Sequence, residues 1–596
     1  MADGLSNTYI RYIYDLAGRV REQRTYAGTA LTGRTRLSTV SYTYEDKTNR
    51  VIDVTYRSAL GEQKTTYSYG AMAQSQMPDA VYSLSTGNQQ QVSYAYDSLG
   101  RLTGRTLTVP NQTTAYTYVS GIGGDANRTT GQVHTVTANG VTTTYAYDAV
   151  GNIVDVTRSD GSGESYDYDE LNQLIEAEIN GVTYTYQYDD RGNLLQKTIG
   201  TETDTYGYTD STWADLLTSF NGQTITYDAI GNPLGYRNGM TMTWQQGRKL
   251  AGVTQNGNTV TYAYDASGAR LSKTVNGSKT EEYRVDGVLY GQKNPDGKLL
   301  MLLKDESGAN FGFTYDGNTY YYLTNLQGDV TGIVDSTGTQ VVSYTYDPYG
   351  KPLAVTGSMA DTIGAVNPLR YRGYYYDAET GFYLTGTRYY DPEIGRFINA
   401  DGYVSTGQGV LGNNMFAYCG NNPVNRKDPS GQGWITALII TAVVVVVSAV
   451  VVKSVADNKI DKSGANDAEK ALAKKDYIAA YQVNKAKTIT EDYIDKTYGR
   501  ENDCDATQVN AYRHAMWNAV MTDRIGEKKA KKFADAHEQF PNNPVEHMEM
   551  DLHNNELGRR IALEYAGQGY DVFSQKIQEA INNGEAKVII WDSNVN

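Results

Sequence analysis

Cysteine is scarce in this sequence: a chain of 596 residues contains only Cys419 and Cys504. They lie far apart, in segments of different composition, so no disulfide framework is predicted. Histidine is also scarce, with five residues. The sequence has no His-Glu-x-x-His motif and no pair of closely spaced cysteines. The commonest sequence signatures of zinc sites are therefore excluded.

Positive charge is in the minority, because 53 Lys and Arg face 68 Asp and Glu, for a net charge of −15. Phosphate contacts need Lys and Arg, so nucleic-acid binding by the whole chain is disfavoured, while a small local site stays open. The first residues contain no apolar run of the kind that a secretory signal needs. We therefore expect that the export signal is absent from this chain.

Tyrosine, by contrast, is abundant, with 52 Tyr against 9 Phe, and Gly is frequent with 60 residues. A tyrosine has a flat apolar ring and a polar tip, which suits half-buried sheet surfaces. Frequent glycine indicates many turns. The length is too great for one hydrophobic core, so several structural units are expected.

A repeated unit dominates residues 1–365: an alternating strand that ends in Tyr-Asp, followed by two residues and a Gly. Copies recur at intervals of about 20 to 30 residues or multiples of these, which is typical of repeat architectures. The close copies are Tyr14-Asp15 with Gly18, Tyr96-Asp97 with Gly100, Tyr147-Asp148 with Gly151, Tyr188-Asp189 with Gly192, Tyr227-Asp228 with Gly231, Tyr264-Asp265 with Gly268 and Tyr346-Asp347 with Gly350.

Each unit is predicted to be a hairpin element. Runs such as residues 142–147 alternate with period two, so their tyrosines share one face of a strand. The Asp is expected to start a turn by accepting backbone hydrogen bonds, and the Gly tolerates the positive φ of that turn. A degenerate copy has Asn172 in the Gly position. One hairpin cannot bury its own face, but stacked units can.

Residues 366–431 carry a second, denser pattern. It runs from Arg370-Tyr-Arg-Gly-Tyr-Tyr-Tyr-Asp377 through Arg388-Tyr-Tyr-Asp-Pro392 to Asp428-Pro-Ser-Gly431. Together with the repeats, this order resembles the RHS/YD-repeat family with its RHS repeat-associated core, which includes wall-associated and polymorphic toxins of bacteria. The resemblance implies a mainly β fold: YD-repeat hairpins spiral into a cocoon-like shell, followed by an apolar helix and a mainly α C-terminal domain. A generic β-solenoid without cargo is the alternative.

The resemblance also implies a site of self-cleavage, because some family members cut themselves near the last Asp-Pro-x-Gly with two aspartates. The matching positions are Asp401 and Asp428. Two departures from the family pattern are Gly402 in place of Pro and Gln432 in place of Leu. A paired-carboxylate protease needs the two groups close enough to share a proton. The alternative is that both are turn aspartates.

Residues 432–453 contain an apolar segment, because residues 434–452 carry no charged side chain. That length meets the requirement for a membrane-spanning helix. Arg426 and Lys427 precede it and Lys453 follows it, so the distribution of positive charge gives no orientation. We expect membrane association through 434–452. The alternative is a buried segment inside the shell, which its many β-branched residues would also suit.

Residues 454–596 are predicted to form a separate helical effector domain. Tyr becomes sparse there and the apolar period changes to about 3.6, with Asp467–Lys475 opening a helical run. Four histidines lie between residues 514 and 553: His514, His537, His547 and His553. Gly558 within a helical pattern costs about 1 kcal/mol, which indicates close packing at that point.

A catalytic centre is predicted where three histidine-bearing helices converge. Its candidate residues are His514, His537, Glu538, Asp551, Asn555 and Arg559. His514, His537 and Asp551 are the candidate ligands of a divalent metal, which would activate water. Without a metal, His514 or His537 is expected to act as the general base, oriented by Asp551. The alternative is a polar core in which these residues satisfy one another.

Two functions are weighed. The first is an interbacterial toxin whose tail is a metal-dependent or histidine-based hydrolase, either a nuclease or a phospholipase, with a cognate immunity protein as partner. The second is a cell-surface binding or adhesion protein with a structural tail. Clustering of histidines favours the first. Either function predicts a secreted, cell-surface or membrane-associated protein.

Overall fold

The computed structural model divides the chain into two compact units. One comprises Met1–Ile13, Arg21–Thr43 and Val51–Val446, and the other Tyr14–Val20, Tyr44–Arg50 and Val447–Asn596. The structure describes the chain except residues 1, 4–7, 16–18, 28–34, 46–49, 60, 70–80, 87, 88, 122–128, 266, 286, 306, 307, 403–409, 434, 437–465, 476, 499–507, 540–544 and 589–596.

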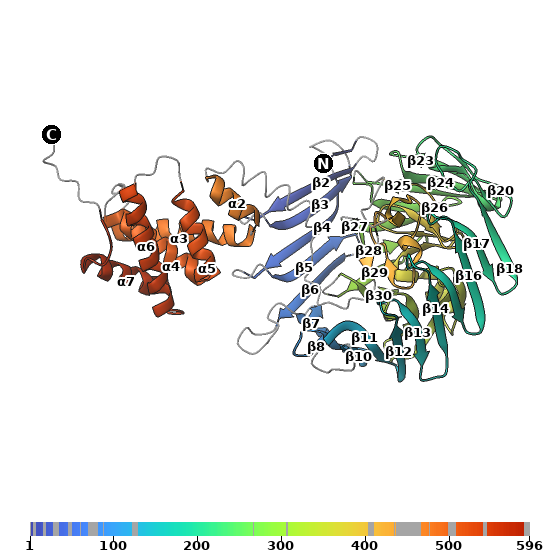
Figure 1. The fold of residues 1–596 in the computed structure, drawn as a ribbon, viewed down its shortest axis with the longest axis horizontal. Coiled ribbons are helices and arrows are strands. Elements are labelled where there is room, and N and C mark those ends of the chain that lie inside the picture. The colour runs from blue at the N-terminus through green and yellow to red at the C-terminus, as the bar shows by residue number, and fades with distance from the viewer. Residues whose placement is uncertain are drawn as a thin grey trace. The chain divides into compact units, whose positions relative to one another are not determined.

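Antiparallel hairpins build the first unit, as the alternating repeats predict (Figure 1). The strands of a 20-stranded sheet are β1 Ala2–Asp3, β2 Thr8–Tyr14, β3 Val20–Ala27, β4 Thr35–Tyr44, β5 Val51–Ser58, β6 Gly61–Tyr69, β7 Val81–Thr86, β8 Gln89–Tyr96, β9 Leu102–Leu107, β10 Gln112–Ser120, β11 Thr129–Ala138, β12 Val141–Tyr147, β13 Ile153–Arg158, β14 Gly163–Tyr168, β15 Leu174–Ile179, β16 Val182–Tyr188, β17 Leu194–Ile199, β18 Glu202–Gly207, β19 Ser219–Phe220 and β20 Gln223–Thr224.

A 14-stranded sheet continues the shell with the same meander, in which each strand pairs with the next along the chain. Its strands are β21 Thr226–Tyr227, β22 Pro233–Gly235, β23 Thr241–Gln245, β24 Lys249–Gln255, β25 Asn258–Tyr264, β26 Arg270–Val275, β27 Ser278–Val285, β28 Val288–Lys293, β29 Leu299–Lys304, β30 Asn310–Tyr315, β31 Asn318–Thr324, β32 Val330–Val334, β33 Gln340–Tyr346 and β34 Pro352–Thr356.

The Tyr-Asp units form the predicted turns. After β12, Oδ1 of Asp148 accepts hydrogen bonds from the backbone N–H groups of Val150, at 3.0 Å, and Asn152, at 2.8 Å. Gly151 has a φ of +98°, and in the degenerate copy Asn172 has a φ of +61°. These positions need the left-handed conformation, which Gly and Asn adopt most readily. The repeat aspartates are therefore turn-formers, as expected.

The tyrosine of each unit explains why Phe is rare. The hydroxyl of Tyr147 donates to the carbonyl of Val133 at 2.6 Å, and that of Tyr188 to the carbonyl of Leu174 at 2.8 Å. Tyr264 and Tyr346 make the same type of bond to Leu250 and Val330. A buried carbonyl needs a donor, and phenylalanine has none to offer.

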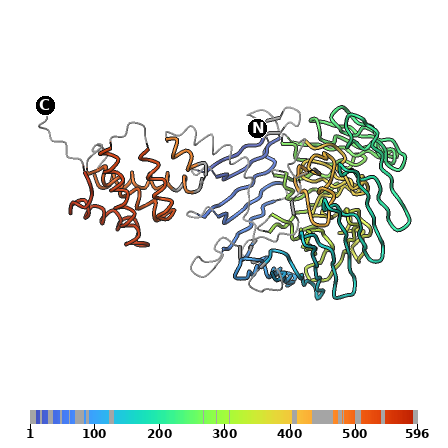
Figure 2. Tube along the Cα trace, in the orientation of Figure 1, coloured from blue at the N-terminus to red at the C-terminus, as the bar shows by residue number. Residues whose placement is uncertain are grey.

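The 366–431 segment packs inside the shell, where its yellow and orange trace lies within the curve of the green strands (Figure 2). It contributes a small antiparallel sheet of β35 Tyr375–Asp377, β36 Phe382–Leu384, β37 Tyr389–Asp391 and β38 Arg396–Phe397. Arg237 pairs with Asp391 at 2.6 Å and Arg270 with Asp377 at 2.6 Å, with all four side chains buried. These ion pairs fix the core segment to the repeat strands.

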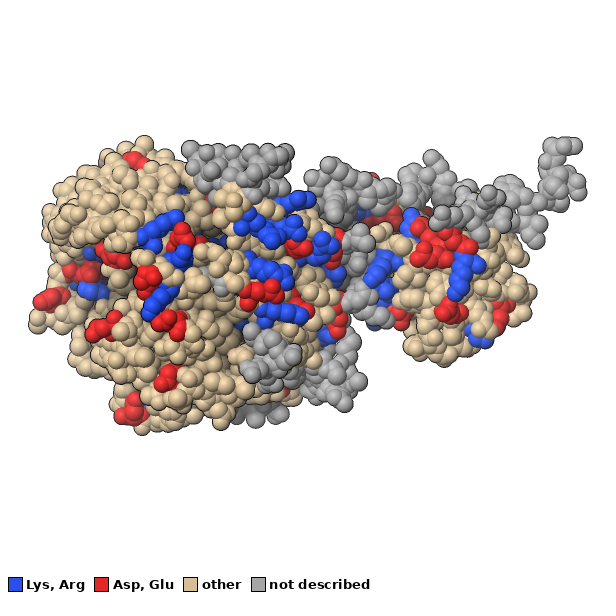
Figure 3. All heavy atoms as spheres, turned by 180° about the vertical axis from the view of Figure 1, so that it is seen from behind, with Lys and Arg blue, Asp and Glu red and all other residues tan. Residues whose placement is uncertain are grey.

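Charges of both signs are interspersed on the face of the molecule shown in Figure 3. The exposed ion pairs of the shell include Arg57–Glu62, at 2.6 Å, and Lys298–Asp316, at 2.7 Å. No broad positive surface is visible on that face, in keeping with the negative net charge.

Helices form the second unit, in agreement with the change of period. Their bounds are α2 Asp467–Lys475, α3 Tyr477–Tyr498, α4 Gln508–Ile525, α5 Glu527–His537, α6 Val545–Glu564 and α7 Tyr570–Asn582. The predicted run Asp467–Lys475 is confirmed as α2. The helices share a core of their own around Tyr512, Met516, Phe573 and Ile577, all of which are buried. The described residues of this core lie between Leu472 and Ala586.

Only two residues of the apolar segment 434–452 are described. Ile435–Thr436 forms β40, which pairs with β39 Arg426–Lys427 rather than beginning a helix. The expected membrane contact through 434–452 otherwise lies outside the described residues. Among the residues that the structure describes, no helix has the length and apolar character needed to cross a bilayer.

Candidate functional site

Helices α4 and α6 approach each other closely in the helical domain. A Cβ atom on Gly558 of α6 would lie 1.9 Å from the carbonyl oxygen of Ala515 on α4. A side chain at position 558 would therefore push the helices apart, so the close packing predicted from Gly558 is confirmed. This contact sets the polar row of α4 against the polar row of α6.

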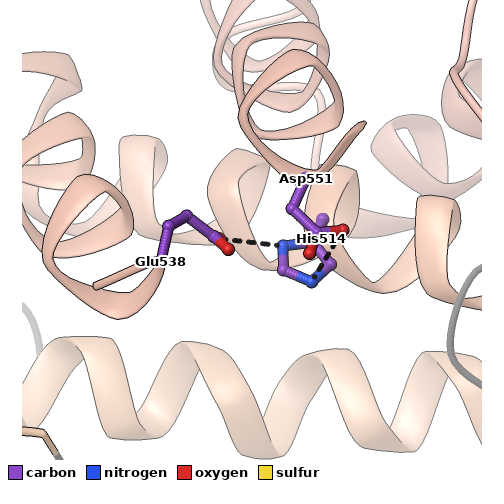
Figure 4. Close-up of side chains that lie close together, drawn as sticks. All are labelled: His514, Glu538 and Asp551. Carbon is purple, nitrogen blue, oxygen red and sulfur yellow. Dashed lines mark ion pairs between the residues drawn. The ribbon is translucent and has the colours of Figure 1, made fainter. Parts of the chain in front are cut away.

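His514 lies where three helices meet (Figure 4). It belongs to α4, Asp551 to α6, and Glu538 follows the last residue of α5. Nδ1 of His514 is 3.5 Å from Oε1 of Glu538, and Nε2 is 3.4 Å from Oδ1 of Asp551. All three residues are buried. Three of the predicted residues are thus brought together.

Amide side chains hold this centre in place. Asn555 donates from Nδ2 to Oε1 of Glu538 at 3.0 Å, and its Oδ1 lies 3.1 Å from Nδ1 of His514. Asn518 donates to the same Oδ1 at 2.5 Å, and Arg559 donates to Oδ1 of Asn518 at 3.0 Å. The predicted residues Asn555 and Arg559 therefore belong to the network, but as supports rather than as part of the three-residue cluster.

Burial controls the ionisation of the centre. It lowers the pKa of His514 to about 4, although the hydrogen bond to Asn555 opposes the shift. It raises the pKa of Glu538, against the hydrogen bond from Asn555 and the nearby charge of His537. At neutral pH the imidazole of His514 is therefore neutral and offers one lone pair.

His537 faces a different partner from the one predicted. Its Nδ1 lies 2.8 Å from Oε1 of Glu469, and its ring centroid is 6.3 Å from that of His514. Burial lowers the pKa of His537, but the hydrogen bond to Glu469 and its charge outweigh burial, so the pKa is raised. Of the predicted metal ligands, His514 and Asp551 thus lie together with Glu538, while His537 forms a neighbouring pair.

Sequence reasoning missed two members of this region. Glu469 of α2 pairs with His537, and Asn510 of α4 donates to Oδ1 of Asp551 at 3.1 Å. A signal for Asn510 was present, because residues 510, 514 and 518 recur at intervals of four and share one helix face. No comparable signal exists for Glu469, which lies far from His537 in the sequence.

The three ligand-type residues form a set that could hold a metal ion, because one ligand atom from each lies within 4.8 Å of the others. Imidazole nitrogen and carboxylate oxygen are ligands of zinc, manganese and similar hydrolytic metals. The same set without an ion offers a neutral imidazole beside two carboxylates. Both arrangements can activate a water molecule.

The two candidate self-cleavage aspartates share one arginine. Nη2 of Arg388 lies 2.8 Å from Oδ2 of Asp401 and 3.7 Å from Oδ2 of Asp428, and all three side chains are buried. Burial lowers the pKa of Arg388 to about 10, although both carboxylates oppose the shift. Sequence reasoning missed this arginine.

Asp428 also organises the backbone that follows it. Its Oδ1 accepts from the N–H groups of Gly431, at 2.8 Å, and Gln432, at 3.2 Å, and its Oδ2 accepts from Gly433 at 3.2 Å. Burial raises the pKa of Asp428, and the charge of Arg388 opposes the rise. The carboxyl group therefore lies against the peptide bonds at which cleavage is predicted, while it also forms a turn.

Comparison with known families bears on the first unit. A family model described as Teneurin YD-shell matches residues 2–424. The chain is a member of the YD-shell family. The match spans the repeats and nearly all of the core segment, which confirms the predicted RHS/YD resemblance and the mainly β shell.

Curated relatives of this YD-shell protein include bacterial toxins. The tRNA3(Ser)-specific nuclease WapA of Bacillus spizizenii is 37% identical over 231 residues, which cover 37% of this chain and 10% of WapA. Toxin subunit YenC1 of Yersinia entomophaga is 30% identical over 233 residues, covering 34% of this chain and 23% of YenC1. The chain thus matches less than a quarter of the length of either relative.

A solved structure supports the fold of the YD shell. The crystal structure of TcdB2-TccC3-Cdc42 is similar with a TM-score of 0.56 at 20% identity, covering 71% of this chain and 24% of that chain. For the helical domain, a model described as a domain of unknown function, DUF6973, matches residues 470–585.

Proposed function

We propose that this protein is a bacterial toxin of the RHS type, acting in competition between bacteria in contact. The YD shell is the scaffold, and the helical domain is a hydrolytic effector. The observation that carries the proposal is the buried imidazole of His514 between Glu538 and Asp551. Toxins among the YD-shell relatives support the same function.

The chemistry follows from the ionisation of His514. A neutral imidazole has a lone pair that either takes a proton from water or binds an ion that acidifies water. Water activated in either way attacks an ester. Two substrate classes fit this step: the phosphodiesters of a nucleic acid and the esters of a phospholipid. The name of WapA, a tRNA nuclease, favours the first class.

The proposed function implies a division of the chain and a set of partners. We assign residues 1–365 to the repeats, 366–431 to the core, 432–453 to the apolar segment and 454–596 to the effector. A hydrolase of this kind would harm the cell that makes it, so a cognate immunity protein is the expected partner. The expected location is secreted or at the cell surface.

Growth of bacteria that express residues 454–596 tests the effector. This segment has its own core and its own family match, so it can be expressed alone after its helical content is verified by circular dichroism. We expect growth arrest, relieved by His514→Ala or Asp551→Ala. His553→Ala is the control, because this half-buried residue lies outside the His514 cluster and hydrogen-bonds the backbone carbonyl of Glu585, so its loss should leave the arrest intact.

The outcome separates the two functional classes. A folded helical domain without any effect on growth, RNA, DNA or lipids favours a surface-binding protein with a structural tail. Growth arrest with degraded RNA or DNA indicates a nuclease. Growth arrest with intact nucleic acid and released fatty acids indicates a phospholipase.

We also propose that Asp401 and Asp428 cut the chain near residue 432. The support is the position of both carboxylates at one guanidinium, beside the backbone of residues 431–433. Purified full-length chain should split into two bands, and Asp428→Asn should prevent the split. Asp361→Asn, at an exposed acid of the shell, is the control. A single band from the wild type after prolonged incubation would overturn this proposal.

A further inference from the structure

Three side chains with metal-ligating atoms converge in the helical domain (Figure 4). One ligand atom from each of His514, Glu538 and Asp551 lies within 4.8 Å of the others, and all three residues are buried. We infer that these residues bind one divalent transition-metal ion. The inference deepens the proposed hydrolase and rests on it for the role of the ion, whereas binding of the ion can be measured independently.

The hydrogen bonds around Asn555 fix the tautomer of His514. Nδ2 of Asn555 donates to the carboxylate of Glu538 at 3.0 Å, so the other atom of this amide, Oδ1, is the acceptor. Oδ1 also accepts from Nδ2 of Asn518 at 2.5 Å. Nδ1 of His514, 3.1 Å from the same oxygen, must then carry a proton in order to donate to it.

A proton on Nδ1 leaves the lone pair of the neutral ring on Nε2. That atom lies 3.4 Å from Oδ1 of Asp551. Two electron-rich atoms therefore face each other in a buried place, which is unfavourable unless a positive charge lies between them. The positive charge of a metal ion between the two atoms supplies this attraction, in addition to the electrostatic interaction of Asp551 with Arg513.

The surroundings of His514 are those of a metal-bound imidazole. Such a ring usually donates its second N–H to a carbonyl or carboxylate oxygen, which fixes its orientation. Asn555 provides that oxygen here, and Asn510 holds Asp551 in turn through a 3.1 Å hydrogen bond. The second carboxylate, Glu538, adds negative charge beside Asp551, and a divalent cation offsets the repulsion between them.

The donor set indicates the class of metal. One imidazole nitrogen and two carboxylate oxygens, without sulfur, suit Zn²⁺ or Mn²⁺. Bonds of about 2.0 to 2.2 Å place ligand atoms within roughly 4.4 Å of each other. The observed spacing, within 4.8 Å, exceeds this limit by no more than about 0.4 Å.

The geometry also shows which of two neighbouring residues, His537 or Glu538, is placed to be the third ligand. His537 directs Nδ1 to Glu469 at 2.8 Å, whereas Glu538, whose Oε1 lies 3.5 Å from Nδ1 of His514, has an oxygen within 4.8 Å of the ligand atoms of both His514 and Asp551. Glu538 is therefore the ligand, and His537 with Glu469 forms a separate ion pair beside the site. Substitutions at the two positions should have opposite outcomes in a binding experiment.

The test is a titration of the full-length chain, stripped of metal with EDTA and dialysed, with MnCl2 and with ZnCl2 in an isothermal calorimeter. We expect one ion per chain for at least one metal. Asp551→Asn and Glu538→Gln preserve side-chain size and should each weaken the affinity by at least about tenfold. His537→Ala and His553→Ala should bind like the wild type, and circular dichroism verifies that each variant is folded.

The possible results separate this inference from the proposed function. Stoichiometric binding that depends on Asp551 and Glu538 supports the metal site, even if the effector domain does not arrest growth. The absence of such binding, or binding that survives both substitutions, overturns the metal site. Growth arrest that depends on His514 but persists without ion binding would leave the hydrolase standing with His514 as a general base.

Discussion

Gly558 lies against the backbone of Ala515, so that a Cβ atom at position 558 would be 1.9 Å from the Ala515 carbonyl oxygen. The absent side chain lets Asn518 reach Asn555 at 2.5 Å, and Asn555 in turn contacts His514. Gly558, three positions from Asn555 and seven from Asp551 on α6, thereby helps to set the geometry of the centre.

Gly558→Ala should destabilise the helical domain. Alanine favours a helix by about 1 kcal/mol over glycine, but the added methyl group collides with backbone that cannot move aside. We expect a net loss of about 1 to 3 kcal/mol in the free energy of unfolding, measured by urea denaturation of residues 454–596. Leu563→Ala, at an exposed position of the same helix, should change stability much less. Equal or greater stability of Gly558→Ala would contradict the close packing.

The sequence predicted the residues of this centre better than their pairing. Spacing along one helix places His514 with Asn518 and Asp551 with Asn555, since residues four apart share a face. Contacts between helices depend on crossing angle and on where each helix ends. The end of α5 directs Glu538, rather than His537, toward His514. Glu469 comes from α2, and no periodicity connects it with His537.

Low pH should decrease the free energy of unfolding of the metal-free helical domain. His514 has a pKa of about 4 in the folded protein against 6.5 for a free histidine, so the unfolded chain binds the extra proton first. The contribution of neutral His514 to the free energy of unfolding is fully present above pH 6.5 and is lost as the pH falls to about 4. The difference corresponds to about 3 kcal/mol.

Urea unfolding of residues 454–596 at several pH values between 7 and 4, in EDTA, checks this expectation. Other acids titrate in the same range, so the relevant quantity is the difference between the wild type and His514→Gln. That difference should shrink as the pH falls. A constant difference would show that His514 does not resist protonation in the fold.

Loss of the hydroxyl group should change the stability of the shell differently at two tyrosines of strand β16. Tyr188 donates to the carbonyl of Leu174 at 2.8 Å, so Tyr188→Phe should cost about 1 kcal/mol. Tyr186 is buried, and its hydroxyl has no hydrogen-bond partner among the described residues. Tyr186→Phe should therefore be neutral or stabilising. Thermal unfolding of the full-length chain gives both values, and equal losses would contradict the assigned role of the hydroxyls.

The repeats made the shell the most predictable part of the fold. Tyr-Asp spacing and alternation predict the strands and the turns, because both depend on neighbours in sequence. The contacts that fix the core segment to the shell join distant residues, such as Arg237 with Asp391 and Arg270 with Asp377. No local pattern predicts these pairs, and none predicts the pairing of Arg388 with Asp401 inside the core segment.

The buried ion pairs of Arg270 provide the last prediction. Its Nε lies 2.7 Å from Glu282 and its Nη1 2.6 Å from Asp377, with none of these side chains exposed. Arg270→Met removes the cation shared by the two buried carboxylates and leaves Glu282 only with Arg284, and Asp377 only with Lys273, so it should cost the shell about 3 to 5 kcal/mol. Urea unfolding followed by near-ultraviolet circular dichroism of the tyrosines measures this loss.

Two controls show whether the loss comes from the uncompensated charges. Lys298→Met breaks an exposed pair with Asp316 and should cost less than about 1 kcal/mol, because water screens that pair. Adding Glu282→Gln and Asp377→Asn to Arg270→Met should restore part of the stability, because the negative charge that Arg270 offset is then removed, while the new amides still offer oxygen acceptors to Arg284 and Lys273. If the triple variant is as unstable as the sum of its parts, the arginine acts through packing rather than charge. A loss no larger than that of Lys298→Met would mean that these ion pairs do not secure the core segment to the shell.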